Sequence, residues 1–336
     1  MTGYSGPMLT LLVLACTDPV APPPVDADRD LPAPTSAMAP PPGPSAPPSS
    51  ATLPPATAPT EGGGLPTALA ADGTLPPLTT ATASLPEVKA LEGEAGKVRL
   101  AGPEAAQPLG KSVNGVTEKL GLIIEAVMAE GSKESLAAVK SGKADCAILG
   151  RPLRPDESDY IATTVGYDGV ALITGRDNAV MGLTTAQIKG IFGGTITSWG
   201  EVGGAADTVN VYRRPDGKTA TKLFEEHFGL AGTVVASATV VDNEKELAST
   251  VRGDKDAIGY VSLAGLRAEG LEGVKLLAID GVQPIVPEIT AKRYALVRPI
   301  SIVTKGAPTG ATKTFVEFLT SKSGQAVVAL SYAPVR

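Results

Sequence analysis

The chain has 336 residues, of which 43% are hydrophobic and only 4% aromatic, and its formal net charge is −6. Residues 1–96 hold nine acidic and two basic side chains, whereas residues 97–336 hold 26 acidic and 27 basic ones, so the second part lacks the strong basic excess of a nucleic-acid-binding protein. With one histidine and two cysteines, the chain offers neither a histidine-rich metal site nor conventional Cys/His nucleophilic chemistry.

Residues 1–16 have the pattern of an export signal. The apolar run Met8–Cys16 is too short to span a bilayer but suits the apolar region of a signal peptide. Its end, Val13-Leu14-Ala15-Cys16, resembles a bacterial lipobox and predicts lipidation of Cys16, although no Lys or Arg precedes the run. The alternative is a disordered apolar terminus with a free thiol.

Residues 17–96 are rich in Pro, Ala, Thr, Ser and Gly, and about two-thirds of the prolines of the chain lie before residue 90. Such a composition buries too little apolar surface to offset the entropy lost on ordering. We therefore expect a disordered, partly polyproline-II tether here, which ends where a domain of residues 97–336 begins.

From residue 97 onward, short β-branched runs alternate with helical stretches, and this alternation predicts an α/β fold with parallel sheets and ligand-binding loops beyond the strand C-termini. The expected strands are 98–101, 122–127, a strand around Cys146, 169–174, 209–212 and 298–304. The expected helices are 135–140, 184–192, 218–228 and a long helix from near Gly310, followed by a closing segment at 324–328.

Cys146 and His227 are both expected to have structural rather than chemical roles. Cys146 lies within an apolar strand and is expected to be a small buried residue. His227 is expected near a helix C-terminus, where partial positive charge is favourable. Because the sequence shows no combination of nucleophile, base and metal ligands, we expect no enzymatic activity and no cofactor.

Several segments, taken in order, resemble the phosphate-binding proteins that feed ABC transporters. These segments are Gly131-Ser132, Ala144–Leu153, Gly166–Ala171, Leu183–Ile188, Ile191–Gly194, Ser198-Trp199, Ala257–Val261, Arg298-Pro299 and Ser323–Gln325. The resemblance implies a two-lobed type II periplasmic-binding fold, with a first lobe at about 97–173 and 298–336 and a second lobe at about 174–297. It also implies that Ile191, Phe192, Trp199 and Tyr260 pack inside the second lobe.

The same resemblance places an oxyanion site in four loops. A dehydrated oxyanion needs converging hydroxyls, backbone N–H groups at helix N-termini and an Arg fork. In the first loop Ala106 replaces the family's Thr and Gln107 its aromatic residue, so the hydroxyl is lost, but the side-chain amide of Gln107 is expected to donate to the ligand in its place. In the second, Ser132 is either a helix N-cap or a ligand contact.

The third and fourth loops each supply an arginine. Before Pro152 the family has Ser-Asp or Ser-Arg, and this chain has Gly150-Arg151, so the proton-accepting Asp of the phosphate-selective members is absent and Arg151 fits the Arg-bearing branch. Arg214 precedes Lys218 and Thr219, which replace part of the family's Ser-Gly-Thr, and Asp216 either orients Arg214 or caps a surface turn. A lysine at a helix start opposes the helix dipole, so Lys218 either lies beside an anion or fills the site.

The leading hypothesis is an exported, lipid-anchored and monomeric receptor that captures phosphate or a related small anion and delivers it to an ABC transporter permease. We expect it in the periplasm or cell envelope of a bacterium, attached to a membrane through its N-terminal lipid and without nucleic-acid partners. The alternative is an envelope sensor or interaction protein whose binding site has degenerated, as the substituted donor positions would allow.

Overall fold

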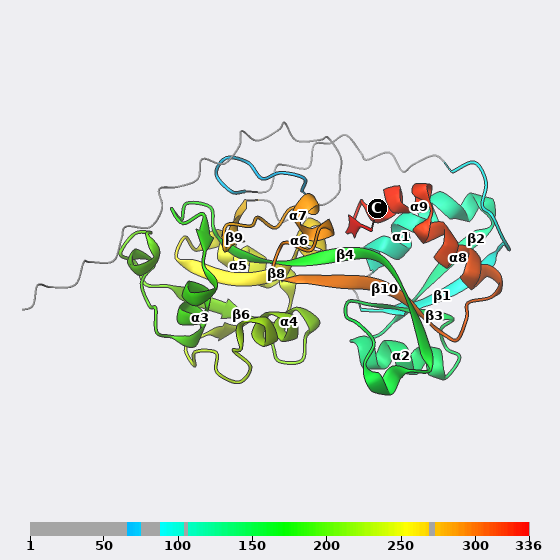
Figure 1. Ribbon diagram of the computed structural model, residues 1–336, viewed down its shortest axis with the longest axis horizontal. Coiled ribbons are helices and arrows are strands. Elements are labelled where there is room, and N and C mark those ends of the chain that lie inside the picture. Colours follow the sequence, from blue (N-terminus) through cyan, green and yellow to red (C-terminus); the bar gives the residue numbers. More distant parts are fainter. Residues whose placement is uncertain (1–65, 75–87, 104–106, 269–272, 336) are drawn as a thin grey trace, which may run out of the picture. The chain divides into compact units, whose positions relative to one another are not determined.

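The computed structural model describes residues 66–74, 88–103, 107–268 and 273–335 (Figure 1). Cys16, the predicted signal and most of the predicted tether lie outside these ranges. The helices are α1 (Gln107–Thr117), α2 (Ser132–Lys140), α3 (Thr185–Gly193), α4 (Thr219–Phe228), α5 (Glu244–Gly253), α6 (Leu263–Ala268), α7 (Val286–Thr290), α8 (Gly310–Thr320) and α9 (Lys322–Val328). Short 3-10 helices lie at Glu118–Leu120, Pro155–Glu157 and Trp199–Val202. Within the described ranges, no helix combines the length and apolar character needed to cross a membrane.

The strands form a mixed sheet in the order β2-β1-β3-β10-β4-β8-β6-β7. Their bounds are β1 (Gly96–Gly102), β2 (Leu122–Met128), β3 (Cys146–Leu149), β4 (Tyr160–Gly175), β5 (Gly182–Leu183), β6 (Asn210–Arg213), β7 (Thr239–Val240), β8 (Ala257–Ser262), β9 (Val274–Ile279), β10 (Val297–Lys305) and β11 (Ala333–Pro334). All the strand and helix positions predicted from the sequence carry an element of the expected type, and the α/β fold is confirmed.

The expectation of purely parallel sheets is wrong. β1 pairs in parallel with β2 and β3, and β6 pairs in parallel with β7 and β8. The long strands β4 and β10 run antiparallel to each other, β4 runs antiparallel to β8, and β10 runs antiparallel to β3. The chain passes along β4 from the β1 group to the β8 group and returns along β10, and these opposite directions make the central pair antiparallel.

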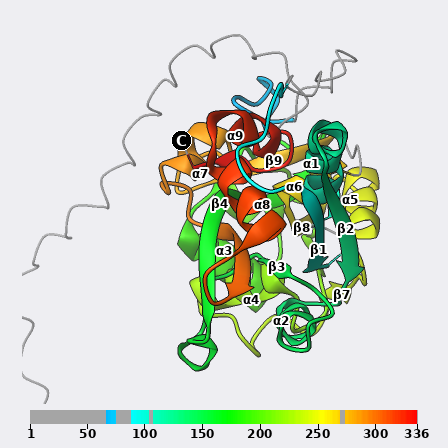
Figure 2. The ribbon, with the colours of Figure 1, turned by 90° about the vertical axis from the view of Figure 1, so that its right-hand side faces the viewer.

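Helices cover both faces of the β1 group because successive side chains of a strand point to opposite faces. Leu100 packs in a cluster with residues of α1 and α8, whereas the next residue, Ala101, packs with Val139 of α2. Figures 1 and 2 show α1, α8 and α9 on one side of these strands and α2 on the other. Cys146 of β3 is fully buried as expected, and this burial raises the pKa of its thiol.

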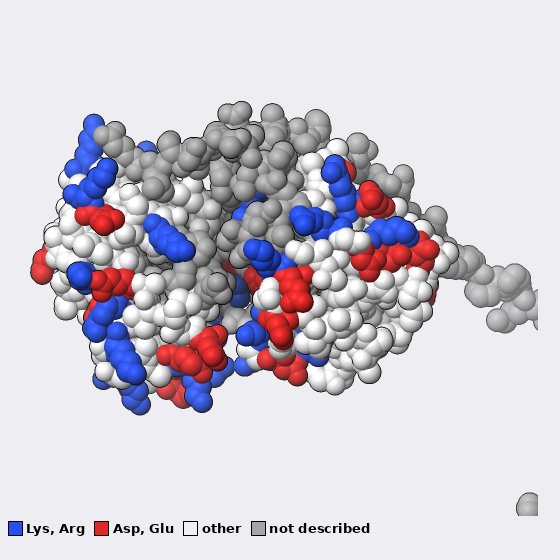
Figure 3. Space-filling model, turned by 180° about the vertical axis from the view of Figure 1, so that it is seen from behind, with Lys and Arg blue, Asp and Glu red and all other residues white. Residues whose placement is uncertain are grey.

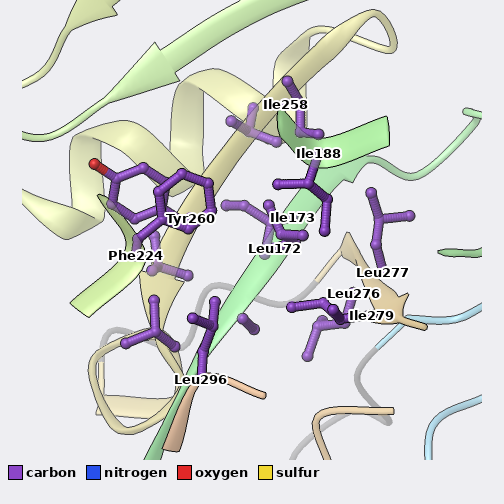
Figure 4. Close-up of a cluster of buried hydrophobic side chains, with 14 of the residues drawn as sticks. Leu172, Ile173, Ile188, Phe224, Ile258, Tyr260, Leu276, Leu277, Ile279 and Leu296 are labelled. Carbon is purple, nitrogen blue, oxygen red and sulfur yellow. The ribbon is translucent and has the colours of Figure 1, made fainter. Parts of the chain in front are cut away.

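A second and larger apolar cluster surrounds β8 and the second half of β4 (Figure 4). The rings of Phe224 and Tyr260 stack with their centroids 4.2 Å apart, and Phe192 meets Phe224 edge-on at 4.6 Å. Trp199 is 1% exposed and donates its indole N–H to the Asp256 carbonyl at 2.9 Å. The packing roles expected for Phe192, Trp199 and Tyr260 are confirmed, as is that of Ile191. His227 lies in the last turn of α4, as expected.

Two parts of the expected tether are structured, residues 66–74 and residues 88–96, and in the second part Val88 and Leu91 pack against the cluster that contains Leu100. Residues 66–74 pack against β9: Leu276 donates its backbone N–H to the Gly73 carbonyl at 2.9 Å, and Thr74 forms a bridge with Lys275. Leu69 belongs to the larger apolar cluster. For residues 66–74 the prediction of disorder is wrong. Their composition does not reveal that Leu69 can pack into the apolar cluster, or that the backbone can pair with β9.

Candidate functional site

The first three predicted loops meet at one edge of the sheet. Gln107 is the first residue of α1, Ser132 is the first residue of α2, and Arg151 follows β3 by two residues. These positions come after β1, β2 and β3, which are parallel neighbours. Since the carboxyl ends of parallel strands lie at the same edge, the fold brings the three loops together.

Ser132 is not a helix N-cap. Gly131 occupies that position with extended backbone angles and caps α2 with no side chain, so Ser132 is the first helical residue. Ser135 donates its hydroxyl to the Gly131 carbonyl at 2.8 Å. The hydroxyl of Ser132 is therefore not used as a cap at the N-terminus of α2, where backbone N–H groups await acceptors.

The guanidinium of Arg151 binds within its own loop. Its two terminal nitrogens donate to the two carboxylate oxygens of Glu157 at 2.7 and 2.6 Å, and one of them also donates to the Pro152 carbonyl at 2.8 Å. This bidentate pair lowers the pKa of Glu157, chiefly through the hydrogen bonds from Arg151. Arg151 thus reaches the predicted edge, but its charge is matched there by a carboxylate six residues away.

The loop after β6 carries two arginines, and Asp216 pairs with the unexpected one. Asp216 forms an ion pair with Arg213 rather than with Arg214, so the predicted orienting role is wrong. Arg213 also lies 3.0 Å from the carboxylate of Glu225, whose pKa is raised by burial. Consecutive strand residues point to opposite faces, and Asp216 lies on the side of Arg213.

Lys218 and Thr219 lie at the start of α4. Lys218 is the N-cap residue, is exposed and makes no capping bond with its side chain, and Thr219 is the first helical residue. The N-terminus of α4 therefore resembles that of α2, because its first N–H groups also lack a side-chain acceptor. By contrast, Thr184, Asn243 and Ser321 cap α3, α5 and α9 with their own side chains.

A buried ionic network links the loops after β3 and β6. Its centre is Asp168, which is fully buried and lies directly opposite Arg298 in the β4–β10 pairing. Arg298 donates to one carboxylate oxygen of Asp168 at 3.0 and 2.7 Å, and Ser262 donates its hydroxyl to the same oxygen at 2.7 Å. On the other side, a Cβ atom at Gly150 would lie 3.5 Å from the Arg298 guanidinium, so the β3 loop adjoins the network.

Glu244, the first residue of α5, extends the network to Arg214. One of its carboxylate oxygens, Oε1, accepts the Ser262 backbone N–H at 3.4 Å and lies 3.6 Å from a terminal nitrogen of Arg214. Burial raises the pKa of Glu244, while the charges of Arg298 and Arg214 oppose that rise. Arg214 is only 8% exposed and donates to the Asp242 carbonyl at 2.8 Å, but its Nε has no partner among the described residues.

The sequence interpretation missed three members of this network. Asp168 and Arg298 lie in segments that carried the family resemblance, yet they are 130 residues apart and no spacing indicates their pairing. Glu244 follows Asn243 and resembles any acidic residue in the first turn of a helix. Only the tertiary fold brings these side chains to Arg214.

Charges of both signs share one face of the molecule. Basic and acidic side chains are interspersed on the face of the molecule drawn in Figure 3, in keeping with the near-neutral charge of residues 97–336. The described residues contain no group of three or more His, Cys, Asp or Glu side chains placed to hold a metal ion. A hollow of about 260 Å³ lies apart from the network, lined by residues of α1, β1 and β2.

Comparisons with known proteins agree with this architecture. The PBP superfamily domain matches residues 91–323. A phosphate-binding protein PstS of Bacillus subtilis is 26% identical over 74% of this chain and 83% of its own length. A second one, PstS 2 of Streptococcus agalactiae, is 37% identical over 36% of this chain, but the match spans only 43% of that relative.

A solved structure covers the same part of the chain. It is a putative phosphate ABC transporter substrate-binding protein from Clostridium perfringens with bound phosphate. The likeness has a TM-score of 0.63 and 29% sequence identity, and it covers 72% of this chain and all of the solved one.

Proposed function

This chain belongs to the PBP superfamily, and we propose that it is a receptor for phosphate or a related small oxyanion, which it delivers to the permease of an ABC transporter. The names of its relatives in Bacillus and Streptococcus and the phosphate bound in the Clostridium structure support this ligand class. The residues of the site must then provide donors for an oxyanion.

The observation that carries the proposal is the state of Arg214. It is nine-tenths buried, yet its Nε lacks a partner among the described residues, and it precedes a helix whose N-terminus has no side-chain cap. A buried donor without an acceptor is costly. An oxyanion at this position would accept from the arginine fork and from the N–H groups of α4 together.

The finer parts of the proposal concern location and assembly. Export and lipidation at Cys16 would hold the receptor in the cell envelope, and the stretch 17–65 would give it reach. Binding would proceed without a chemical step, with the chain as a monomer. We also propose the lobe boundaries expected from the sequence, about 97–173 with 298–336 and about 174–297, because the apolar clusters draw mainly on these two sets of residues.

The proposal is tested by titrating the whole chain with sodium phosphate, sodium sulfate and sodium chloride, following heat and melting temperature. A ligand that binds only the folded form stabilises it by about 2.7 kcal/mol at a concentration of one hundred times its Kd. We expect phosphate to raise the melting temperature and chloride to leave it unchanged. If no oxyanion acts at millimolar concentration, the receptor function is wrong.

A second candidate is an envelope sensor or interaction protein without transport binding. It is favoured by one observation, namely that Arg151 and Arg214 both have carboxylate neighbours within the chain. An absence of any oxyanion response, together with normal folding, would support this candidate instead.

A further inference from the structure

The two consecutive arginines after β6 contact different helices. Arg214 lies beside Glu244 of α5, whereas Arg213, the last residue of β6, contacts α4. A terminal nitrogen of Arg213 lies 3.0 Å from Oε1 of Glu225, in the second turn of α4. This ion pair therefore joins the end of the strand directly to the helix that follows it.

The pair between Arg213 and Glu225 lies away from water. The two side chains are 17% and 11% exposed. Oε1 of Glu225 is shielded from solvent and has no aligned hydrogen bond in the part of the chain that the structure describes, so the attraction of opposite charges holds the pair. Such an attraction is strong where water is excluded. The pair therefore resists a displacement of α4 from β6.

The segment between the two partners carries the candidate site. Residues 214–218 leave β6 and enter α4, whose first N–H groups lack a side-chain acceptor. The second partner of Arg213, Asp216, belongs to this segment, and its side chain is 84% exposed. An anion that is bound by both Arg214 and the start of α4 requires these donors to be held at a fixed distance from each other.

We propose that Glu225 is a positioning residue of the oxyanion site, which holds α4 through Arg213 so that the helix N-terminus and Arg214 reach the same anion. This inference rests on the proposed receptor function. Glu225 donates nothing to the ligand, since an ionised carboxylate only accepts hydrogen bonds. It acts through the ion pair.

A positioning role and a purely electrostatic role predict changes of opposite sign. If Glu225 acted only as a negative charge near the site, its removal would strengthen the binding of an anion. If Glu225 positions α4, its removal weakens binding because the two sets of donors no longer converge on the ligand. The sign of the change in phosphate affinity therefore distinguishes the two roles.

Acid should reproduce the removal of this charge. Burial raises the pKa of Glu225, and Arg213 opposes this rise while Asp216 adds to it, so the carboxyl gains its proton at a higher pH than an exposed glutamate. Tyr260 of β8 also interacts electrostatically with Glu225, whereas α3 meets α4 through the apolar ring of Phe192. A protonated Glu225 has no charge to hold Arg213, so phosphate affinity should fall as the pH falls through its folded pKa.

The decisive experiment measures the phosphate affinity of the whole chain by calorimetry, from neutral to mildly acidic pH, for the unchanged protein and for Glu225→Gln. The glutamine has the same shape but no charge. At neutral pH we expect the affinity to fall by about tenfold, within the usual range of coupling between linked sites. In acid the two affinities should approach each other. The ionisation of phosphate is common to both proteins and cancels in this comparison.

Three further variants separate position from charge. Glu226→Gln removes an exposed carboxylate from the same turn of α4 and should leave the affinity unchanged. Glu225→Asp keeps the charge but shortens the side chain, so it should also weaken binding, and it supplies the test if Glu225→Gln does not fold. Adding Glu225→Gln to Arg213→Gln should cause little further loss, because the pair is already broken. Melting temperatures without phosphate report whether each variant folds.

The outcomes distinguish the two proposals. If the unchanged protein binds no oxyanion, both the receptor function and the role of Glu225 are wrong. If it binds phosphate, and the folded Glu225 variants bind phosphate as tightly as the unchanged protein or more tightly, only the role of Glu225 is overturned.

Discussion

The loops after β3 and β6 each place an arginine at the candidate site, but the two arginines have different partners. Arg151 forms a bidentate pair with Glu157, six residues along the same loop. A terminal nitrogen of Arg214 lies 3.6 Å from a carboxylate oxygen of Glu244, thirty residues away on α5. Arg298 and Asp168 also interact electrostatically with that carboxylate. One arginine is neutralised locally, whereas the other belongs to a network that joins several elements.

This difference determines what each arginine offers to a ligand. A bidentate pair satisfies the fork of Arg151, so an incoming anion must displace Glu157 before it gains the same hydrogen bonds. Arg214 makes longer contacts, and its buried Nε has no hydrogen-bond partner in the part of the chain that the structure describes. We therefore expect ligand binding and stability to depend on Arg214 much more than on Arg151.

Replacement of Arg214 by alanine should have the largest effect. It removes the fork and leaves Glu244 with less positive charge, so phosphate affinity should fall by at least about a hundredfold, in line with a loss of about 3 kcal/mol for truncating one partner of a buried charge pair. Calorimetry measures the phosphate affinity, and urea unfolding measures the accompanying change in stability. Arg154→Ala, an exposed arginine of the β3 loop, is the control. A stronger loss of binding in Arg151→Ala than in Arg214→Ala would reverse the comparison.

Replacement of Asp168 by asparagine tests the centre of the network. Arg298 would lose the negative charge of its fully buried partner, and we expect the free energy of unfolding to fall by about 3 kcal/mol. Urea unfolding measures the change. Asp207→Asn, which breaks an exposed pair with Lys255, should change stability little. Equal effects of the two substitutions would show that the buried network contributes no more than a surface pair.

The fold was largely predictable because local patterns determine its elements. The apolar run 169–174 predicted part of β4, but the strand begins at Tyr160, and its first half is not a continuous apolar run because it contains Thr163 and Thr164 and is partly exposed. α1 was not predicted because Gly110 and Gly115 weaken its helical pattern. The direction of β4 and β10 depends on connections across the domain, which no window of sequence contains.

The candidate site was predictable only in part. The loops carrying Arg151 and Arg214 follow strands, and strand ends can be recognised from sequence. The partner of each arginine cannot be recognised, since Glu157 and Glu244 look alike as acidic residues at helix starts. Their roles differ because one lies within its own loop and the other reaches a buried pair formed by Asp168 and Arg298.

The smallest effect is expected from Glu157→Gln, which releases Arg151 from its local partner. The lost pair should lower stability by about 1 kcal/mol at neutral pH, since the partners are well aligned but close to the surface. The pKa of Glu157 is lowered in the folded state, so its contribution is present above the pKa of the unfolded chain and disappears as the pH falls through the lower folded value. The stability difference from the unchanged protein should therefore shrink in acid, as urea unfolding at neutral and acidic pH would measure.

The same variant tests whether Arg151 can bind an anion once Glu157 no longer pairs with it. Once released, its fork can turn towards an anion, and phosphate affinity should rise by about tenfold, the equivalent of one charge-assisted hydrogen bond of about 1.5 kcal/mol. Glu226→Gln, an exposed change on α4, serves as the control. A loss of affinity as severe as that of Arg214→Ala would mean that the Arg151–Glu157 pair shapes the site itself, and the contrast between the two loops would no longer hold. A modest gain in phosphate affinity would instead show that Arg151 is kept from the anion by its pairing with Glu157 and not by its position in the fold.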